Sequence, residues 1–309
     1  MRRIFKYSLL FIALTILCYI TVFSIFYIAR YKDKPLICYT NGYLLWKGGD
    51  SYQKFHEFDQ NQKHNTIILG SSLAYRGYDP RIFRKEGYDA FNLGSSNQSL
   101  LQSYAILTQN IKVENTKNLI LDVNIEAFKT DGLESSADLI QNLKNEATAW
   151  KITCNQKDIR AFNMLFLRQL QKFEKPFFKD DDYVGYGFCE THLQLNSIPK
   201  IKALPNQNIL DSQINYFRKI LKYCMHNQLN LILVNHPKGL LETRSSHEKF
   251  IQIIEKELKD YDFEFIDYYN FCQLSTEDYY DEYHLNQNGV NKFNSYLIKE
   301  LKQKNLLLE

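Results

Sequence analysis

The fold of this chain is limited first by a run of 23 residues without a charged side chain, Tyr7 to Ala29. The run is rich in Leu, Ile, Phe and Val. As an α-helix rising about 1.5 Å per residue, it would span the roughly 30 Å hydrocarbon core of a bilayer. No comparable run follows it. The sequence therefore predicts a single transmembrane helix within an N-terminal tail and anchor, residues 1–34.

A cleaved signal peptide is the alternative interpretation of this run. The run is longer than the apolar region of a signal peptide, about 7–15 residues, and it has no small-x-small exit. Three Lys or Arg residues lie on each side of it, so the positive-inside rule does not fix its orientation. The short N-terminal tail favours an N-terminus inside and a main domain outside the membrane.

The charge of the chain gives little reason to expect a polyanionic partner. The net charge is +3, and residues 1–34 hold six basic residues and one acid, so the remainder has 32 basic and 34 acidic residues. Without a basic field, nucleic-acid binding is not expected. The cysteines lack CxxC spacing and the histidines lack ligand spacing, so neither a metal nor another cofactor is expected. A Cys154–Cys189 disulfide in an oxidising compartment stays open.

Beyond a polar, aromatic connector at residues 35–63, apolar runs alternate with helical patterns. Strands are expected at Thr66–Leu69, Ala90–Leu93, Asn118–Val123, Leu229–Val234 and Phe263–Ile266. Helices are expected at residues 80–86, Ser99–Ile111, Leu210–Asn227, Ser245–Tyr261 and Gln287–Lys304. This alternation predicts a three-layer α/β/α domain with a parallel sheet, residues 64–309.

One segment, residues 129–207, interrupts the alternation. It contains two helical patterns, at Leu133–Lys151 and Lys157–Phe173, and then a loop rich in acidic, aromatic and glycine residues, Asp180 to Glu190. A connection this long between strands predicts an insertion that covers the site. The aromatic side chains of the loop could stack on a sugar ring, although loop packing is their commoner role.

Four polar signals coincide with the ends of predicted strands. Ser72 follows the first strand, Gly94 the second and Asn124 the third, while Asp281 and His284 lie in the loop after the last strand. Alone, each is an ordinary turn or capping feature. Parallel α/β sheets carry their sites at the carboxyl ends of the strands, so together these residues predict one site.

The residue types match a nucleophilic mechanism. A serine hydroxyl attacks well only when a base removes its proton, and histidine does this near neutral pH. We expect Ser72 as the nucleophile, His284 as the base and Asp281 as the carboxylate that orients the imidazole. The tetrahedral intermediate needs donors where its negative charge develops. The backbone N–H groups of Ser72 and Gly94 and the Asn124 amide are the candidates for this oxyanion hole.

Two further polar residues at strand ends are weaker candidates. His236 follows the Leu229–Val234 strand and could line the pocket, although a polar loop residue is the commoner reading. Asp267 follows the last strand, but it lies farther from His284 in sequence than Asp281 does.

The sequence resembles the SGNH, or GDSL-like, superfamily of hydrolases and acyltransferases. The matching blocks are Gly70-Ser71-Ser72, Gly94, Asn124 and Asp281-x-x-His284-Leu285-Asn286-x-x-Gly289, in this order. Ser71 stands in place of the Asp of the GDSL motif, and Asp122-Val123-Asn124 stands where the family has Gly-x-Asn-Asp. The resemblance implies an SGNH/flavodoxin-like fold with Ser72, His284 and Asp281 in the triad.

Within the superfamily, the chain is similar to membrane-anchored proteins of teichoic-acid D-alanylation and exopolysaccharide O-acetylation. This resemblance implies an acyl-Ser72 intermediate, an extracytoplasmic cell-envelope polysaccharide as substrate and a multi-pass membrane O-acyltransferase as partner. The domain would lie outside the cytoplasmic (inner) membrane on a single-pass anchor. Two alternatives stay open: an extracytoplasmic carbohydrate esterase, and a catalytically inactive glycan-binding or scaffold protein.

Overall fold

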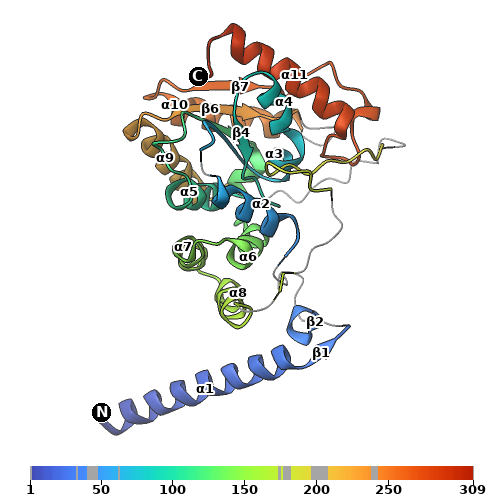
Figure 1. Ribbon diagram of the computed structural model, residues 1–309. Helices are drawn as coiled ribbons and strands as arrows, with labels where there is room; N and C mark the ends of the chain where they lie inside the picture. The colour runs from blue at the N-terminus through green and yellow to red at the C-terminus, as the bar shows by residue number, and fades with distance from the viewer. Residues whose placement is uncertain are drawn as a thin grey trace. The chain divides into compact units, whose positions relative to one another are not determined.

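The computed structural model describes most of the chain, and its residues divide into two compact units, Met1–Trp46 and Lys47–Glu309 (Figure 1). The described residues are 2–32, 34–39, 48–61, 63–172, 175–176, 182–195, 208–237 and 243–308. Parts of the predicted connector and of the predicted insertion, including Asp180, lie outside them.

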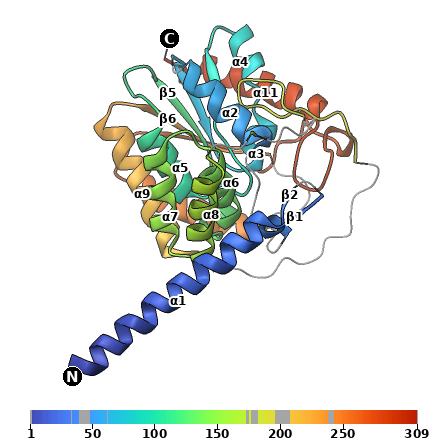
Figure 2. The same ribbon diagram turned by 60° about the horizontal axis from the view of Figure 1, so that its bottom comes forward.

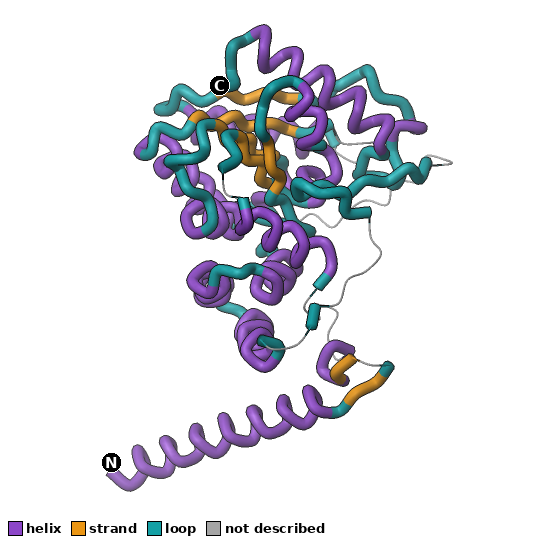
Figure 3. Tube along the Cα trace, in the orientation of Figure 1, coloured by secondary structure: helices purple, strands orange, loops and turns teal. Residues whose placement is uncertain are grey.

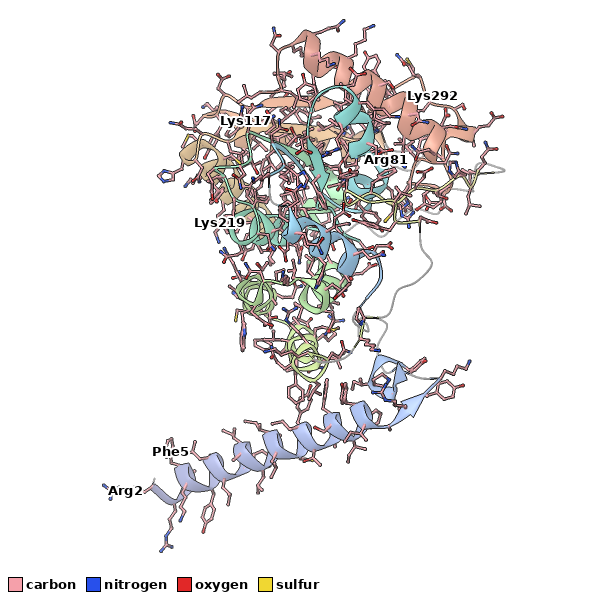
Figure 4. All side chains as sticks on the ribbon, in the orientation of Figure 1. Arg2, Phe5, Arg81, Lys117, Lys219 and Lys292 are labelled. Atoms are coloured by element: carbon pink, nitrogen blue, oxygen red, sulfur yellow. The ribbon has the colours of Figure 1, made fainter. Side chains whose placement is uncertain are left out.

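The first unit is built on one long helix, α1 (Arg2–Ile28), followed by the short strands β1 (Arg30–Tyr31) and β2 (Lys34–Pro35) and by the 3-10 turn η1 (Leu36–Tyr39). Among the described helices, α1 is long and apolar enough to cross a membrane, with a mean hydropathy of 2.6 over its most apolar window. Its apolar side chains project all round (Figure 4). The hydroxyl groups of Thr15 and Thr21 donate to backbone carbonyls one turn earlier, so these polar groups are satisfied within the helix.

The second unit contains a five-stranded parallel sheet in the order β4-β3-β5-β6-β7. Its strands are β3 (Thr66–Leu69), β4 (Ala90–Asn92), β5 (Asn118–Asp122), β6 (Asn230–Asn235) and β7 (Glu264–Asp267). The chain runs from β3 outward to β4 and then returns past β3 to β5, so the winding direction reverses between β3 and β5. In open α/β sheets ligands bind at such a switch point, at the carboxyl ends of the strands.

Helices cover both faces of this sheet, which confirms the predicted three-layer α/β/α class (Figures 2 and 3). One face packs on α3 (Ser72–Gly77), α4 (Pro80–Lys85) and α11 (Gln287–Gln303); Ile68, Ile120 and Ile232 share a buried core with Phe293 there. The other face packs on α5 (Leu100–Gln109), α9 (Asp211–His226) and α10 (Arg244–Leu258). The residues of β3, β4 and β5 are all buried, as their largely apolar runs predicted, whereas the edge strand β7 is only partly buried.

The inserted helices differ from the sequence-based prediction. The pattern at Leu133–Lys151 forms two helices, α6 (Leu133–Asn142) and α7 (Glu146–Gln156), and α8 (Ile159–Leu170) follows. The break occurs because Asn145 caps α7: its side chain accepts from the Thr148 N–H at 3.2 Å. A further helix, α2 (Gly49–Gln60), forms within the segment predicted as a connector and packs on α6 in the second unit.

Candidate active site

The turn after β3 places Ser72 at the first position of α3. Gly70 has φ +150°, and a Cβ there would lie 2.7 Å from the Asp122 Cβ and 2.9 Å from the Ala74 Cβ, so only glycine fits between β5 and α3. Ser71 then caps the helix, its hydroxyl accepting from the Leu73 N–H at 3.3 Å. Ser72 therefore begins a helix at the carboxyl end of a central strand.

The loop before α11 brings His284 to Ser72 across 212 residues of sequence. The His284 Nε2 lies 2.7 Å from the Ser72 Oγ. On the other side of the ring, Nδ1 lies 2.8 Å and 3.0 Å from the two carboxylate oxygens of Asp281. Because a carboxylate only accepts, Nδ1 carries the ring proton and Nε2 is left to accept from the serine hydroxyl. The residues predicted as nucleophile, base and acid thus form one hydrogen-bonded chain.

Local hydrogen bonds hold the Asp281 carboxylate in this orientation. Its Oδ1 also accepts from the backbone N–H groups of Tyr283 and His284, both at 2.8 Å. Burial would raise the pKa of Asp281, but the hydrogen bonds from the His284 ring and these N–H groups outweigh it and lower the pKa. Asp281 is therefore ionised at neutral pH and stabilises a proton on the imidazole.

A stack of planar groups fixes the ring of His284. The Tyr280 ring lies nearly parallel to the imidazole, with centroids 5.4 Å apart and 15° between the planes. The Arg76 guanidinium covers Tyr280 at 5.5 Å and also Tyr75, which lies in the same helix as Ser72, at 5.4 Å. Arg76 and Tyr280 are not among the residues predicted for the site. Their positions, four residues after Ser72 and four before His284, are the signal that could have identified them.

Two of the predicted oxyanion donors, the Gly94 N–H and the Asn124 amide, differ in the hydrogen bonds that they already make. The Gly94 N–H donates to the Asn92 Oδ1 at 3.0 Å, so this contact competes with an oxyanion. The Asn124 Oδ1 accepts from the Glu126 N–H at 2.9 Å, which fixes the amide plane. Among the described residues, the Asn124 amide nitrogen has no hydrogen-bond partner and is free to donate. The N–H of Ser72, first in its helix, has no intrahelical acceptor.

The segment 182–195 makes backbone hydrogen bonds both to α3, which carries Ser72, and to the loop that carries Asp281 and His284. The Cys189 N–H donates to the Tyr75 carbonyl of α3 at 3.1 Å, and the Leu195 N–H donates to the Tyr279 carbonyl beside the triad loop at 2.8 Å. Between them, the Thr191 carbonyl accepts from the Gln287 N–H at the start of α11, also at 2.8 Å. The segment thus holds the helix of Ser72 and the loop of His284 in fixed positions relative to each other.

The aromatic side chains of this segment are used in packing. Tyr183 donates to Glu57 of α2, and Phe188 is fully buried in the core. Tyr186 lies under the Arg84 guanidinium, 4.5 Å from its ring centroid. Cys189 is a buried free thiol and Cys154 an exposed one, so the suggested disulfide does not form.

The two weaker strand-end candidates are used elsewhere. His236 is buried beside the rings of Tyr78 and Phe293. Asp267 accepts from His247 at 3.0 Å and from the Asn235 amide at 2.8 Å, and it takes no part in the triad. No group of three or more metal-ligating side chains occurs in the described ranges.

Comparison with known proteins gives one family model, which matches residues 191–306, less than half of the chain. No curated protein matches. The chain is similar to solved structures of a GDSL-like lipase from Bacteroides thetaiotaomicron (9% identity, 82% of this chain and 99% of that one, TM-score 0.42) and a lipase/acylhydrolase from Enterococcus faecalis (12%, 78% and 96%, 0.41). An acetyl xylan esterase is a third (12%, 76% and 99%, 0.41).

Proposed function

We propose that this chain is a membrane-anchored serine acyltransferase of the SGNH type that O-acetylates an extracytoplasmic cell-envelope polysaccharide. The observation that carries the proposal is the continuous hydrogen-bonded chain from Ser72 through His284 to Asp281. A hydroxyl joined to an imidazole that is itself oriented by an ionised carboxylate is the arrangement needed for acyl transfer through serine.

In the proposed reaction, the His284 Nε2 takes the hydroxyl proton as the Ser72 Oγ attacks the acyl carbonyl carbon. The oxyanion accepts hydrogen bonds from the Ser72 N–H and the Asn124 amide, with the Gly94 N–H as a donor shared with Asn92. His284 then protonates the leaving group, and the acyl group stays on Ser72. A sugar hydroxyl then gives its proton to His284 as its oxygen attacks the acyl carbon. His284 returns this proton to the Ser72 Oγ as the acyl–serine bond breaks, which releases the sugar ester and free Ser72.

A labelling experiment tests this function. A fluorophosphonate probe should react with the purified protein at Ser72, and Ser72→Ala should abolish the reaction. Ser71→Ala is the matched control, because it removes the neighbouring hydroxyl, a helix cap worth about 1 kcal/mol, and leaves the triad intact. Labelling that survives in Ser72→Ala, or that disappears in Ser71→Ala with the fold intact, would contradict the assignment.

The surroundings of the site keep hydrolysis as a second candidate function. The side chains of His284 and Asp281 are 17% and 32% exposed, so water can reach the base. Water competes with every sugar acceptor for an acyl-serine. An extracytoplasmic carbohydrate esterase with the same residues in the same roles is therefore the alternative, and an inactive glycan-binding protein is the outcome if Ser72 proves unreactive.

The proposed location rests on α1. A helix of 27 residues with apolar side chains on all sides is suited to span the cytoplasmic (inner) membrane once, with the second unit outside the cytoplasm. A transferase on that side needs activated acyl groups delivered through the membrane. A multi-pass membrane O-acyltransferase is the partner that we propose for this step.

A further inference from the structure

A lysine of α2 is buried beside the candidate site. Lys54 is 1% exposed, and its Nζ donates to the carbonyl oxygen of Gly94 and lies over the Tyr75 ring, 4.5 Å from the centroid. Lysine is almost never fully buried, because an ammonium group loses strong hydration. A buried ammonium aimed at one backbone carbonyl therefore suggests a specific role for that contact.

Carboxylates on two helices compensate the Lys54 charge. Asp50 precedes it by one turn of α2, and Asp138 faces it from α6, where Ser51 and Asn142 hold the carboxylate. Burial lowers the pKa of Lys54, and these carboxylates act in the opposite direction. The charged and titratable groups around the ammonium are Asp50, Asp138, Cys189, Arg76 and Tyr75.

The Gly94 loop that Lys54 holds lies directly against the turn that carries Ser72. The Ser95 N–H donates to the Gly70 carbonyl at 3.2 Å, and a Cβ on Gly94 would lie 3.0 Å from the Ala74 Cβ. The Gly94 N–H is held by Asn92, whose amide nitrogen donates to two carbonyls of the α3 segment, those of Ala74 and Tyr78. Both peptides that flank Gly94 are thus fixed.

We propose that Lys54 is a positioning residue for the acyl-transfer site: it holds the Gly94 carbonyl and places a buried positive charge beside the loop that faces the developing oxyanion. This inference rests on the proposed function. Glycine has the least intrinsic backbone preference, so an external contact is needed to set its peptide orientation. A fixed charge that needs no reorganisation stabilises a transition state more than a ground state.

The discriminating variant is Lys54→Met, which keeps an unbranched side chain of similar length and removes the ammonium group. Its kcat for a small acetyl ester and its rate of fluorophosphonate labelling should both fall about 10- to 100-fold, with KM within about two-fold of wild type. A purely structural role would lower the melting temperature without this separation of kcat from KM.

Lys219→Met is the matched control. The Lys219 ammonium lies 4.5 Å from the Tyr216 ring centroid, the same distance as Lys54 from Tyr75. Lys219 is an exposed side chain of α9, on the face of the sheet opposite to α3 (Figure 4 labels Lys219). This variant should keep the wild-type kcat and labelling rate. It removes an ammonium group at the same centroid distance from a tyrosine ring, so it shows whether the loss of such a contact outside the site affects activity.

Asp138→Asn covers the case in which Lys54→Met does not fold. It removes a charge that favours the ammonium and keeps the side-chain shape, so kcat should fall about two- to ten-fold. The inference is wrong if Lys54→Met folds and keeps the wild-type kcat and labelling rate. If Lys54→Met does not fold, an unchanged kcat in Asp138→Asn contradicts the inference instead. Ser72→Ala in the same assay separates the proposed function from the role of Lys54. If Ser72→Ala is still labelled, the proposed function is wrong. If Ser72→Ala is not labelled but Lys54→Met is labelled at the wild-type rate, only the role of Lys54 is wrong.

Discussion

Gly187 lies against Asn92 so closely that a Cβ on the glycine would be 1.7 Å from the Asn92 carbonyl oxygen. The neighbouring Tyr186 carbonyl accepts from the Asn92 N–H at 2.9 Å, so the segment 182–195 is fastened to the end of β4. The same segment binds α3 and the triad loop through its backbone. Its position on Asn92 therefore bears on the distance between Ser72 and His284.

Replacement of Gly187 should weaken the contact between the segment 182–195 and the end of β4. Gly187→Ala forces the segment away from Asn92 and adds strain at φ +81°, and we expect a loss of about 2–4 kcal/mol in the free energy of unfolding, with kcat falling at least ten-fold. Gly185→Ala is the control, because φ is +96° there but the nearest atom to a Cβ is 3.8 Å away. Equal effects of both substitutions in urea unfolding and esterase assays would show that the contact with Asn92 is unimportant.

The triad should behave as one unit. His284→Ala and Asp281→Asn should each lower kcat by about 10²–10⁶-fold, and the double variant should be little worse than His284→Ala alone. Asp281→Asn should also destabilise the fold at neutral pH. The lowered pKa of Asp281 gives a contribution that is present above the unfolded pKa and is lost as the pH falls through the folded value. Additive effects on kcat, or a near-normal rate in His284→Ala, would exclude the base role.

The free energy of unfolding should fall as the pH is lowered from 7 to 5, because of His64. Burial and the nearby Arg84 lower the pKa of His64 to about 4, so the folded state holds it neutral, whereas the unfolded chain protonates it near 6.5. The unfolded state then binds more protons between these values, and lowering the pH from 7 to 5 should cost about 2 kcal/mol.

Urea unfolding of wild type and His64→Phe at the two pH values tests this effect. Phenylalanine suits a site between Phe58 and Phe91, so this variant should lose most of the pH dependence, even though it also gives up the contact with Asp89. If the free energy of unfolding of His64→Phe still falls between pH 7 and pH 5 as much as that of wild type, another group causes the loss of stability in acid.

The anchor hypothesis predicts where the C-terminus lies. A reporter that is active only outside the cytoplasm, fused after Glu309, should be active, and the protein should stay with membranes after a carbonate wash. A chain that starts at residue 35 should appear in the soluble fraction and retain fluorophosphonate labelling. Activity of a cytoplasm-only reporter at the same position would refute the extracytoplasmic assignment.

Transfer and hydrolysis predict opposite changes in the envelope polysaccharide. If the protein is a transferase, it should turn over small acetyl esters slowly in water and faster when an acceptor oligosaccharide is added, because the acceptor competes with water for the acyl-serine. The polysaccharide from a Ser72→Ala strain should then carry fewer O-acyl groups than wild type. A gain of O-acyl groups would instead identify an esterase, and no change would leave another substrate or the binding-protein alternative.

The strand pattern and the polar residues at the strand ends identified the class of the fold and the three residues of the triad. The bounds of all five strands lie within one residue of the predicted ranges. For β3 and β5 the reason is that strands buried on both faces read as nearly continuous apolar runs. Ser72, Asp281 and His284 could be grouped because the ends of parallel strands converge, and because the Asp281–His284 contact is local, spanning three residues.

The contacts around the triad depend on segments that are far apart in the sequence. Nothing local indicates that Lys54 reaches the Gly94 carbonyl, that the Tyr75 carbonyl accepts from the Cys189 N–H, or that the Asn92 amide nitrogen donates to the Ala74 carbonyl. Burial and hydrogen bonding of such groups depend on which segments meet in space, and a sequence pattern reports only the period of one segment. A lysine between the apolar positions of α2 looks like a solvated residue until a second helix and a loop enclose it.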